Sequence, residues 1–305
     1  MELAQIKTIL IAGAGTMGQQ TALLCALNDY DVVIYDISDD ILEKGMERIQ
    51  KNAARMTGFN LCTQGAADKA LSRISTTSDL AAAAGNADLV IESVPEDPAL
   101  KGRLFNDINR CCKPATIFTT NTSSLLPSMF AKETGRPAKL CALHFHDVAL
   151  SKIVDVMPHP GTSKETVDLV RQFAEDLGQI PIVLTKENNG YVFNNMLMSF
   201  LGSALTLAAK DVAPIEEIDR SWMGVMHTLV GPFGIMDSIG LDTSWKVTDY
   251  WAEKRNDPQA KANAAFLKAY VDKGNLGIKT GQGFYTYPDP AFGKSDFLTP
   301  PKSKQ

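Results

Sequence analysis

The sequence is poor in cysteine, and its cysteines follow no spacing that binds zinc. They form no Cys-x-x-Cys pair and no cluster with histidine, and their odd number does not suit a disulfide framework. Zinc-bound and disulfide-stabilised fold classes are therefore excluded. Because most of the cysteines lie in apolar contexts, we expect reduced, buried thiols in a cytoplasmic protein. The cysteines are Cys25, Cys62, Cys111, Cys112 and Cys141.

Long apolar runs and an excess of basic residues are also missing. The nearest candidate for a membrane span, residues 196–209, is short and contains Ser199, Ser203 and Thr206. An apolar strand pattern begins within a few residues of the N-terminus, so we expect no signal peptide. The net charge of -5 argues against nucleic acid or an anionic membrane as the main partner. A chain of 305 residues is longer than a single hydrophobic core usually accommodates, which favours two domains.

The most informative stretch lies near the start of the chain. An apolar run at residues 9–12 leads into a glycine turn, and a helical pattern follows over residues 19–28. A second apolar run, residues 32–35, ends at Asp36. Strand, glycine turn, helix, strand and carboxylate is the order that a dinucleotide-binding unit requires. The alternative is a glycine-rich turn that binds nothing. The turn reads Gly13-Ala14-Gly15-Thr16-Met17-Gly18.

Each conspicuous residue of this stretch has a physical role in such a unit. Gly13 permits a tight turn, Gly15 lets a pyrophosphate approach the backbone, and Gly18 lets the helix pack close to the strand. We expect the whole turn to contact the cofactor, because the free amides of the first helical turn favour an anion. Asp36 would accept hydrogen bonds from a ribose diol and would repel a phosphate there. The predicted cofactor is therefore NAD rather than NADP.

Polar side chains gather after later predicted strands. A buried parallel strand is expected at residues 88–92, and another at 115–118. Ligands of an open α/β sheet bind beyond the carboxyl ends of its strands, so we expect a site at the cluster that follows the second strand. A helix-capping loop, the alternative, would explain only one or two of these side chains. The cluster is Thr119-Thr120-Asn121-Thr122-Ser123-Ser124.

Two histidines lie in the next predicted strand, residues 140–147. His144 and His146 point to the same side if the strand continues. Asp155 lies among apolar residues of the short strand after it. A histidine at the end of a strand, with a carboxylate on its neighbour, favours a general base. The alternative is a purely structural histidine.

The pattern changes at residues 186–190, where strand signals nearly vanish and helical signals take over. We predict an α/β domain over residues 1–187 and an all-helical domain over residues 188–305. The first helix of the second domain, residues 191–210, is mostly apolar and predicts an interface between domains or subunits. In the first domain, residues 58–67 are expected to form a polar connection.

With these motifs together, the sequence resembles the 3-hydroxyacyl-CoA dehydrogenases, including the bacterial 3-hydroxybutyryl-CoA dehydrogenases. The likeness runs from about Ile6 to Tyr287. Beyond the glycine turn, it is carried by Val94-Pro95-Glu96 with Lys101, Asn121-Thr122-Ser123-Ser124-Leu125, Leu143-His144-Phe145, Gly190-Tyr191-Val192-Phe193-Asn194, Gly231-Pro232-Phe233, Gly240-Leu241-Asp242 and Lys279-Thr280-Gly281-Gln282-Gly283-Phe284-Tyr285.

This resemblance implies a Rossmann-type, doubly wound NAD domain, a helical second domain and a homodimer built on that second domain. It implies NAD-dependent, reversible oxidation of an L-3-hydroxyacyl-CoA, with 3-hydroxybutyryl-CoA as one such substrate. It also implies a role for single residues. His144 is the catalytic base and Asp155 its partner, Ser123 and Asn194 hydrogen-bond the reacting oxygen, and Glu96, Lys101, Ser123 and Lys279 contact the cofactor.

The sequence departs from the family's pattern at several places. Asp155 stands where glutamate is usual, after a shorter connection from the histidine. The usual Phe-Asn-Pro after His-Phe is His146-Asp147-Val148, and the usual Asn-Arg is Asn194-Asn195. The lysine-rich helix end that helps to hold coenzyme A in the family reads Met56-Thr57-Gly58-Phe59.

These departures leave two other hypotheses open. One is a dehydrogenase of a free 3-hydroxy acid without CoA, similar to gulonate dehydrogenase and lambda-crystallin. The other is an NAD-binding structural or regulatory protein that has lost the chemistry. Retention of Ser123, His144 and Asn194 together argues against this last hypothesis.

Overall fold

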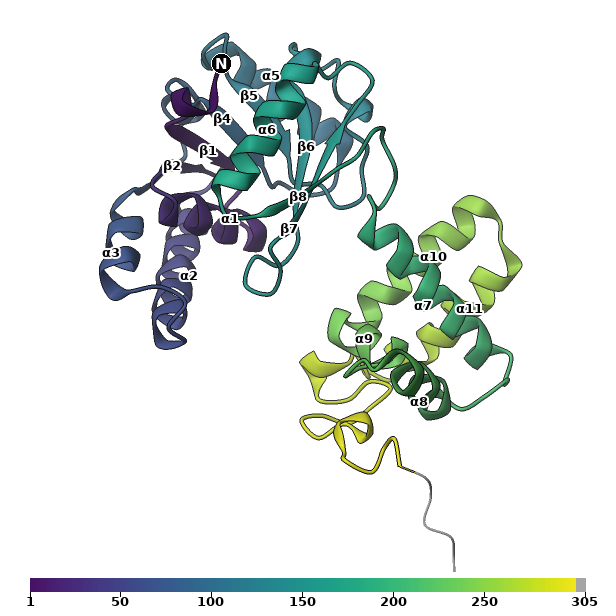
Figure 1. The fold of residues 1–305 in the computed structure, drawn as a ribbon. Coiled ribbons are helices and arrows are strands. Elements are labelled where there is room, and N and C mark those ends of the chain that lie inside the picture. Colours follow the sequence, from purple (N-terminus) through teal and green to yellow (C-terminus); the bar gives the residue numbers. More distant parts are fainter. Residues whose placement is uncertain (300–305) are drawn as a thin grey trace, which may run out of the picture. The chain divides into compact units, whose positions relative to one another are not determined.

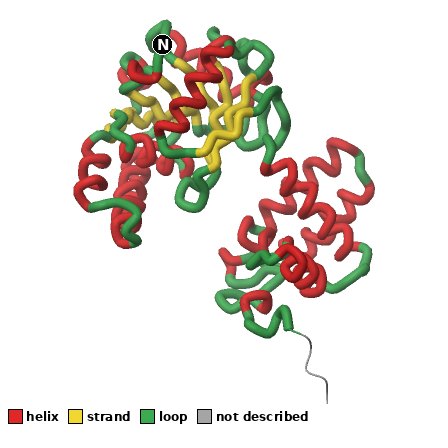
Figure 2. The backbone as a smooth tube through the Cα atoms, in the orientation of Figure 1, coloured by secondary structure: helices red, strands yellow, loops and turns green. Residues whose placement is uncertain are grey.

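The structure is a computed structural model that describes residues 1–299. The chain forms two compact units, Met1–Val192 and a second that begins at Phe193 (Figure 1). All strands of the described residues belong to the first unit, and the second is built from helices and loops (Figure 2). No helix among residues 1–299 has the length and apolar content that a membrane span requires.

The first unit is organised by one eight-stranded sheet with the order β3-β2-β1-β4-β5-β6-β7-β8. Neighbouring strands are parallel except β6 and β7, which are antiparallel. The predicted doubly wound α/β sheet is therefore confirmed. The strands are β1 (Thr8–Ala12), β2 (Asp31–Tyr35), β3 (Ile74–Thr77), β4 (Leu89–Glu92), β5 (Ile117–Thr120), β6 (Leu140–Phe145), β7 (Ile153–Pro158) and β8 (Ile180–Val183).

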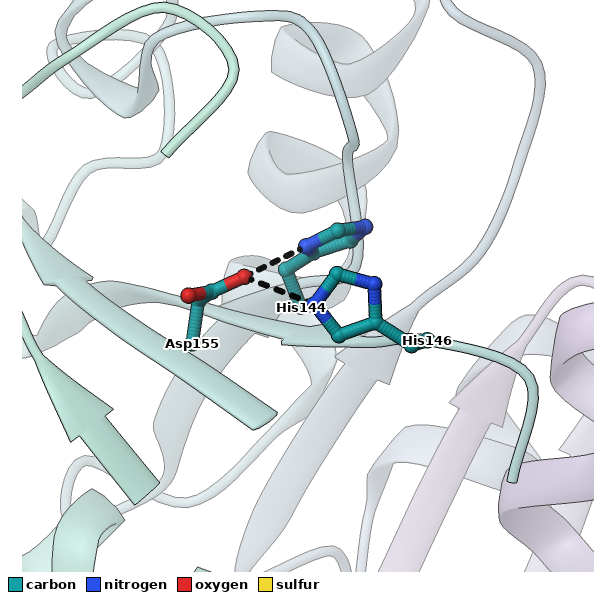
Figure 3. Close-up of side chains that lie close together, drawn as sticks. All are labelled: His144, His146 and Asp155. Atoms are coloured by element: carbon teal, nitrogen blue, oxygen red, sulfur yellow. Dashed lines mark hydrogen bonds and ion pairs between the residues drawn. The ribbon is translucent and has the colours of Figure 1, made fainter. Parts of the chain in front are cut away.

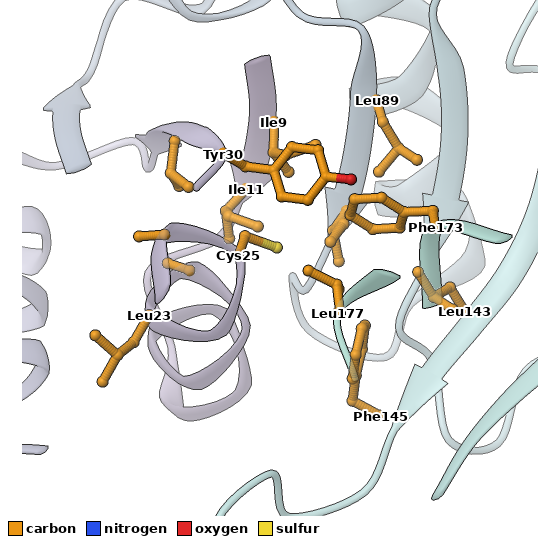
Figure 4. Packing of buried hydrophobic residues seen from close by; sticks show 14 of the residues in the cluster. Ile9, Ile11, Leu23, Cys25, Tyr30, Leu89, Leu143, Phe145, Phe173 and Leu177 are labelled. Atoms are coloured by element: carbon orange, nitrogen blue, oxygen red, sulfur yellow. The ribbon is translucent and has the colours of Figure 1, made fainter. Parts of the chain in front are cut away.

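Helices cover both faces of this sheet because its strands alternate their side chains between two apolar cores. In β1, Ile9 and Ile11 pack in the core that includes Phe173 of α6 (Figure 4). Leu10 packs in the opposite core, with Phe105 of α5. The helices are α1 (Thr16–Leu27), α2 (Asp39–Gly58), α3 (Gln64–Ser72), α4 (Leu80–Ala84), α5 (Pro98–Cys111) and α6 (Lys164–Asp176).

Two sequence predictions for this unit need correction. The stretch 58–67 is not only a connection, because α3 begins at Gln64 and the Thr63 hydroxyl accepts a hydrogen bond from the Ala66 amide at its start. The expectation of buried thiols holds for Cys25 and Cys141, whereas Cys111 is exposed. All five cysteines are thiols that form no disulfide.

The helical unit packs around one apolar core that includes Leu205, Phe233 and Leu267. Two buried carboxylates tie its segments together. Asp219 accepts hydrogen bonds from the Phe233 and Gly234 amides and the Tyr285 hydroxyl, and Asp237 accepts from the Phe284 and Tyr285 amides. The helices are α7 (Phe193–Ala209), α8 (Ile215–Met226), α9 (Pro232–Ile239), α10 (Leu241–Arg255) and α11 (Pro258–Val271). Short 3-10 helices complete the described chain: η1 (Leu3–Gln5), η2 (Pro127–Met129), η3 (Pro137–Lys139), η4 (Ile278–Thr280) and η5 (Ala291–Gly293).

Candidate active site

The glycine turn connects β1 to α1 with the geometry that the sequence predicts. Gly13 has a φ of +114°, and a Cβ atom there would lie 2.7 Å from the Ser93 carbonyl oxygen. A Cβ on Gly18 would lie 1.9 Å from the Gly13 carbonyl oxygen, so only glycine permits this close packing. At Gly15, the N-cap of α1, a Cβ would meet nothing within 4 Å. The backbone there is open to an incoming pyrophosphate.

Asp36 is held against this turn. Its Oδ2 atom accepts a hydrogen bond from the Ala14 amide at 2.8 Å, and its Oδ1 atom accepts one from the Ile37 amide at 2.8 Å. Each carboxylate oxygen keeps a further lone pair for a ribose hydroxyl. Thr16 and Met17 form the first turn of α1, where amides favour an anion. The residues present therefore fit NAD.

Lys101 is buried, although the resemblance makes it a cofactor contact. Only 1% of its side chain is exposed. Its Nζ atom lies 2.6 Å from Glu92 Oε1, 3.1 Å from the Val94 carbonyl oxygen and 3.3 Å from Glu96 Oε2. These acceptors match the three protons of an ammonium group. Burial raises the pKa of Glu92, and the opposing effect of the Lys101 charge and hydrogen bond does not cancel this rise. In this geometry Lys101 positions Glu96.

Glu96 in turn holds the loop that carries Ser123. The Thr122 hydroxyl lies 2.8 Å from both Glu96 oxygens, and the Ser123 amide donates to Oε1 at 2.9 Å. Burial by itself would raise the pKa of Glu96, but Lys101 and these hydrogen bonds outweigh it and lower that pKa. The Ser123 side chain remains exposed at the end of β5.

The polar cluster after β5 is only partly available to a ligand. Thr119 and Thr120 lie inside the strand, where their hydroxyls donate to the Val90 carbonyl and to Glu92 Oε2. Asn121 Oδ1 accepts from the Phe145 amide at 2.7 Å and thereby ties the ends of β5 and β6 together. Of the cluster's hydroxyl residues, only Ser123 and Ser124 are exposed. The others are structural.

The antiparallel pairing of β6 with β7 brings His144 opposite Asp155. His144 Nδ1 lies 3.0 Å from Asp155 Oδ2, and both side chains are buried (Figure 3). The Tyr191 ring stacks on His144 with centroids 4.6 Å apart, and the Tyr191 hydroxyl donates to the Thr122 carbonyl. Burial raises the pKa of Tyr191 well above its ordinary value. The predicted histidine–carboxylate pair is thus present in the structure, with aspartate in place of glutamate.

His146 joins the same carboxylate, although it was not among the predicted site residues. Its Nε2 atom lies 3.1 Å from Asp155 Oδ2, and its ring meets the His144 ring edge to face at 4.7 Å (Figure 3). Burial would raise the pKa of Asp155, but the bonds from both histidines outweigh it and lower that pKa. The alternation of side chains along a strand was the available signal, because it places residues 144 and 146 on one face.

The remaining predicted residues belong to the helical unit. Asn194 lies in the first turn of α7. Lys279 lies in η4, and its ammonium group forms an ion pair with Asp242. Their roles toward the reacting oxygen and the cofactor stay predictions.

Comparison with known proteins agrees with this geometry over nearly the whole chain. Residues 8–188 match the model for the 3-hydroxyacyl-CoA dehydrogenase NAD binding domain, and residues 190–287 match the model for the C-terminal domain of the same family. The probable 3-hydroxybutyryl-CoA dehydrogenase of Bacillus subtilis is 34% identical over 93% of this chain and 98% of its own.

Solved structures give the same result. The (S)-3-hydroxybutyryl-CoA dehydrogenase of Ralstonia eutropha is similar with a TM-score of 0.84 and 30% identity, covering 93% of this chain and 100% of its own. A diketoreductase that acts on dicarbonyl compounds has a TM-score of 0.87 and 38% identity, covering 92% and 99%. The chain therefore belongs to the 3-hydroxyacyl-CoA dehydrogenase family and carries that family's NAD-binding domain.

Proposed function

We propose that the protein oxidises the hydroxyl group of an L-3-hydroxyacyl-CoA to the 3-ketone, reversibly and with NAD. The observation that carries this proposal is the buried His144–Asp155 pair at the end of β6, in the unit that also holds the glycine turn. Bound NAD supplies the acceptor for the hydride that leaves the substrate carbon. The family's short-chain members favour 3-hydroxybutyryl-CoA as the first substrate to test.

Asp155 fixes the tautomer of His144. An ionised carboxylate only accepts hydrogen bonds, so the Nδ1 atom that faces it carries the proton. The lone pair of neutral His144 is then on Nε2, which takes the hydroxyl proton of the substrate during oxidation. The Asp155 charge stabilises the imidazolium that forms. In the reducing direction the same nitrogen returns the proton.

Ser123 and Asn194 are proposed to polarise the reacting oxygen. Support for Ser123 comes from its exposed position after β5, on a loop that Glu96 holds in place, with its hydroxyl donating to Glu96 Oε1 at 3.4 Å. A hydrogen-bond donor fixed in advance stabilises developing negative charge more effectively than a mobile one. Asn194 is assigned by its match to the family's motif. We further propose that Glu96 contacts the cofactor, with Lys101 as its positioning residue, and that Lys279 contacts it from the helical unit.

Whether the substrate carries CoA is the finer part of the proposal. The exposed basic residues Lys44, Arg48 and Arg55 on α2 support a contact with CoA phosphates. In contrast, Phe59 at the end of α2 is 69% exposed where the family has lysines. This feature, together with the similarity to a diketoreductase, favours a free 3-hydroxy acid or dicarbonyl compound as the second candidate.

A matched pair of substrates separates these candidates. We expect NADH oxidation with acetoacetyl-CoA to exceed that with free acetoacetate, and NADPH to support little turnover because Asp36 repels its phosphate. In the His144→Ala variant, turnover should fall by about 10²- to 10⁴-fold while NADH still binds. Activity with free acetoacetate alone would favour the second candidate, and near-normal turnover of His144→Ala would remove this residue from the mechanism.

We also propose a cytoplasmic homodimer that assembles through the helical unit. Large apolar side chains are exposed on this unit, as a subunit interface requires. They include Met196 on α7, Val225 and Met226 on α8, and Leu229 in the loop after α8, which is 91% exposed.

A further inference from the structure

The geometry points to a second use of the strand ends at β6 and β7: we propose that His144, His146 and Asp155 form an inhibitory binding site for Zn²⁺. The three side chains offer one ligand atom each, and these atoms all lie within 4.8 Å of one another. Two imidazole nitrogens and a carboxylate oxygen form a ligand set that zinc prefers. His146 is one of the residues at which the sequence departs from the pattern of the family it resembles.

The two nitrogen–oxygen distances already suit the ion, and the two imidazole nitrogens, which lie within 4.8 Å of each other, must move closer together to bind it. Tetrahedral zinc with bonds of about 2.0–2.1 Å holds its ligand atoms about 3.3 Å apart. The two nitrogens now lie 3.0 and 3.1 Å from Asp155 Oδ2. Within the described residues, Asp155 Oδ1 is buried and has no hydrogen-bond partner. The carboxylate can therefore turn toward an ion without breaking any other bond.

The ligands differ in access, which defines the route of entry. The side chains of His144 and Asp155 are 6% and 1% exposed, whereas that of His146 is 17% exposed. The ion would therefore reach the site past His146. Tyr191 stacks on His144 with ring centroids 4.6 Å apart and so restrains the orientation of that ring.

Zinc at this site would block the base that the proposed function requires. The ion takes the lone pairs of His144 Nδ1 and His146 Nε2, so the protons that these atoms donate to Asp155 move through solvent to His144 Nε2 and His146 Nδ1. No bond to carbon changes, and each neutral ring keeps a single proton. With a proton on Nε2, His144 has no lone pair to accept the hydroxyl proton of the substrate. Inhibition thus rests on the proposed function, whereas zinc binding does not.

The test measures binding and inhibition separately on the full chain after treatment with EDTA. Zinc binding is measured by competition with a chromogenic chelator, and turnover is measured with and without zinc. We expect the native chain to bind one equivalent of zinc, to lose its activity with zinc and to regain it with EDTA. In His146→Phe and His146→Gln, both the bound equivalent and the inhibition should be lost. The glutamine variant keeps an amide that can donate to Asp155 and thus preserves local packing.

His227→Asn is the matched control. His227 is an exposed histidine of the helical unit in the left-handed backbone region, which asparagine tolerates. This variant should bind zinc and be inhibited as the native chain is. Zinc binding that is unchanged in both His146 variants, or absent from the native chain, would overturn the proposed site. If the chain binds zinc but reduces no 3-keto compound, the proposed zinc site would stand and the proposed function would be refuted.

Discussion

At the scale of single residues, Asp155 determines what the two histidines can do. It is buried within β7 and accepts hydrogen bonds from two imidazole rings through one oxygen. It stays ionised because these hydrogen bonds lower its pKa. A buried charge of this kind is tolerated only when donors surround it. The arrangement explains how aspartate serves where the family has glutamate, because the antiparallel register already places residue 155 directly opposite residue 144.

Replacing Asp155 by asparagine should separate ring orientation from folding. The amide has nearly the same shape, but it lacks the charge that fixes the Nδ1–H tautomer of His144 and stabilises the imidazolium. We expect Asp155→Asn to fold and to lose about 10²- to 10⁴-fold in kcat. Circular dichroism and steady-state kinetics measure the two properties. Asp147→Asn is the control, since Asp147 is exposed and accepts from the Ala149 amide instead. An unchanged kcat in Asp155→Asn would show that another group orients His144.

How much of the site could be predicted depends on whether its contacts are local in sequence. The glycine turn and Asp36 follow one another along the chain, so their geometry was foreseen. The sharing of Asp155 by two histidines was not, because it depends on the register of β6 against β7, which the sequence analysis did not assign. The burial of Lys101 was also not predicted, although its partners Glu92, Val94 and Glu96 are near in sequence, because it depends on how α5 packs beside the end of β4.

At the scale of elements, the sheet was predictable and α3 was not. Continuous apolar runs mark the parallel strands, which are buried on both faces. The sequence of α3 is short and contains Gly65, so its intrinsic helical preference is weak. Its helical state is instead consistent with the burial of Ala67 and Ala70 and with its contacts to α1. The strand β5 was predicted too early, at residues 115–118; it runs over Ile117–Thr120 and so includes Thr119 and Thr120, which looked like ligand groups.

The element that joins β1 to α1 offers a test with two glycines. In Gly18→Ala, the new methyl group would clash with the Gly13 carbonyl oxygen, so the turn must shift. We expect a lower melting temperature, because the free energy of unfolding should fall by about 1–3 kcal/mol, and we expect weaker NADH binding. In Gly15→Ala, the methyl group meets no protein atom, so the melting temperature should hold while NADH binding weakens.

Thermal melting with and without NADH measures both effects. The two variants differ in position by a single turn of α1, and each adds one methyl group, so they control for each other. Equal affinity for NADH in Gly15→Ala and the native chain would mean that the pyrophosphate does not approach this part of the backbone.

At the scale of the whole molecule, acid should change the stability of the two units in opposite directions. In the first unit the pKa values of Asp88, Glu96 and Asp155 are lowered, since cationic or hydrogen-bonding partners outweigh burial, and these three groups outnumber Glu92, whose pKa burial raises. Their stabilisation is present above the pKa of the unfolded chain and is lost as the pH falls through the folded value. The first unit should therefore lose stability below about pH 4.

The helical unit contains the reverse case. Burial raises the pKa of Asp219 from the ordinary 3.8 to about 6, although three donors oppose it. The folded unit binds this proton more tightly than the unfolded chain, so its stability rises as the pH falls from about 6 to about 4. A shift of this size corresponds to at most about 3 kcal/mol.

Tryptophan fluorescence can isolate this response. The only tryptophans of the chain, Trp222, Trp245 and Trp251, all belong to the helical unit. We expect the melting temperature seen by fluorescence to rise between pH 6 and pH 4. The Asp219→Asn variant cannot titrate at this position. Its melting temperature should therefore change less with pH, even though its mean stability falls. If the native chain melts at the same temperature across this range, or if the variant keeps the full slope, the burial of Asp219 is not what couples the helical unit to pH.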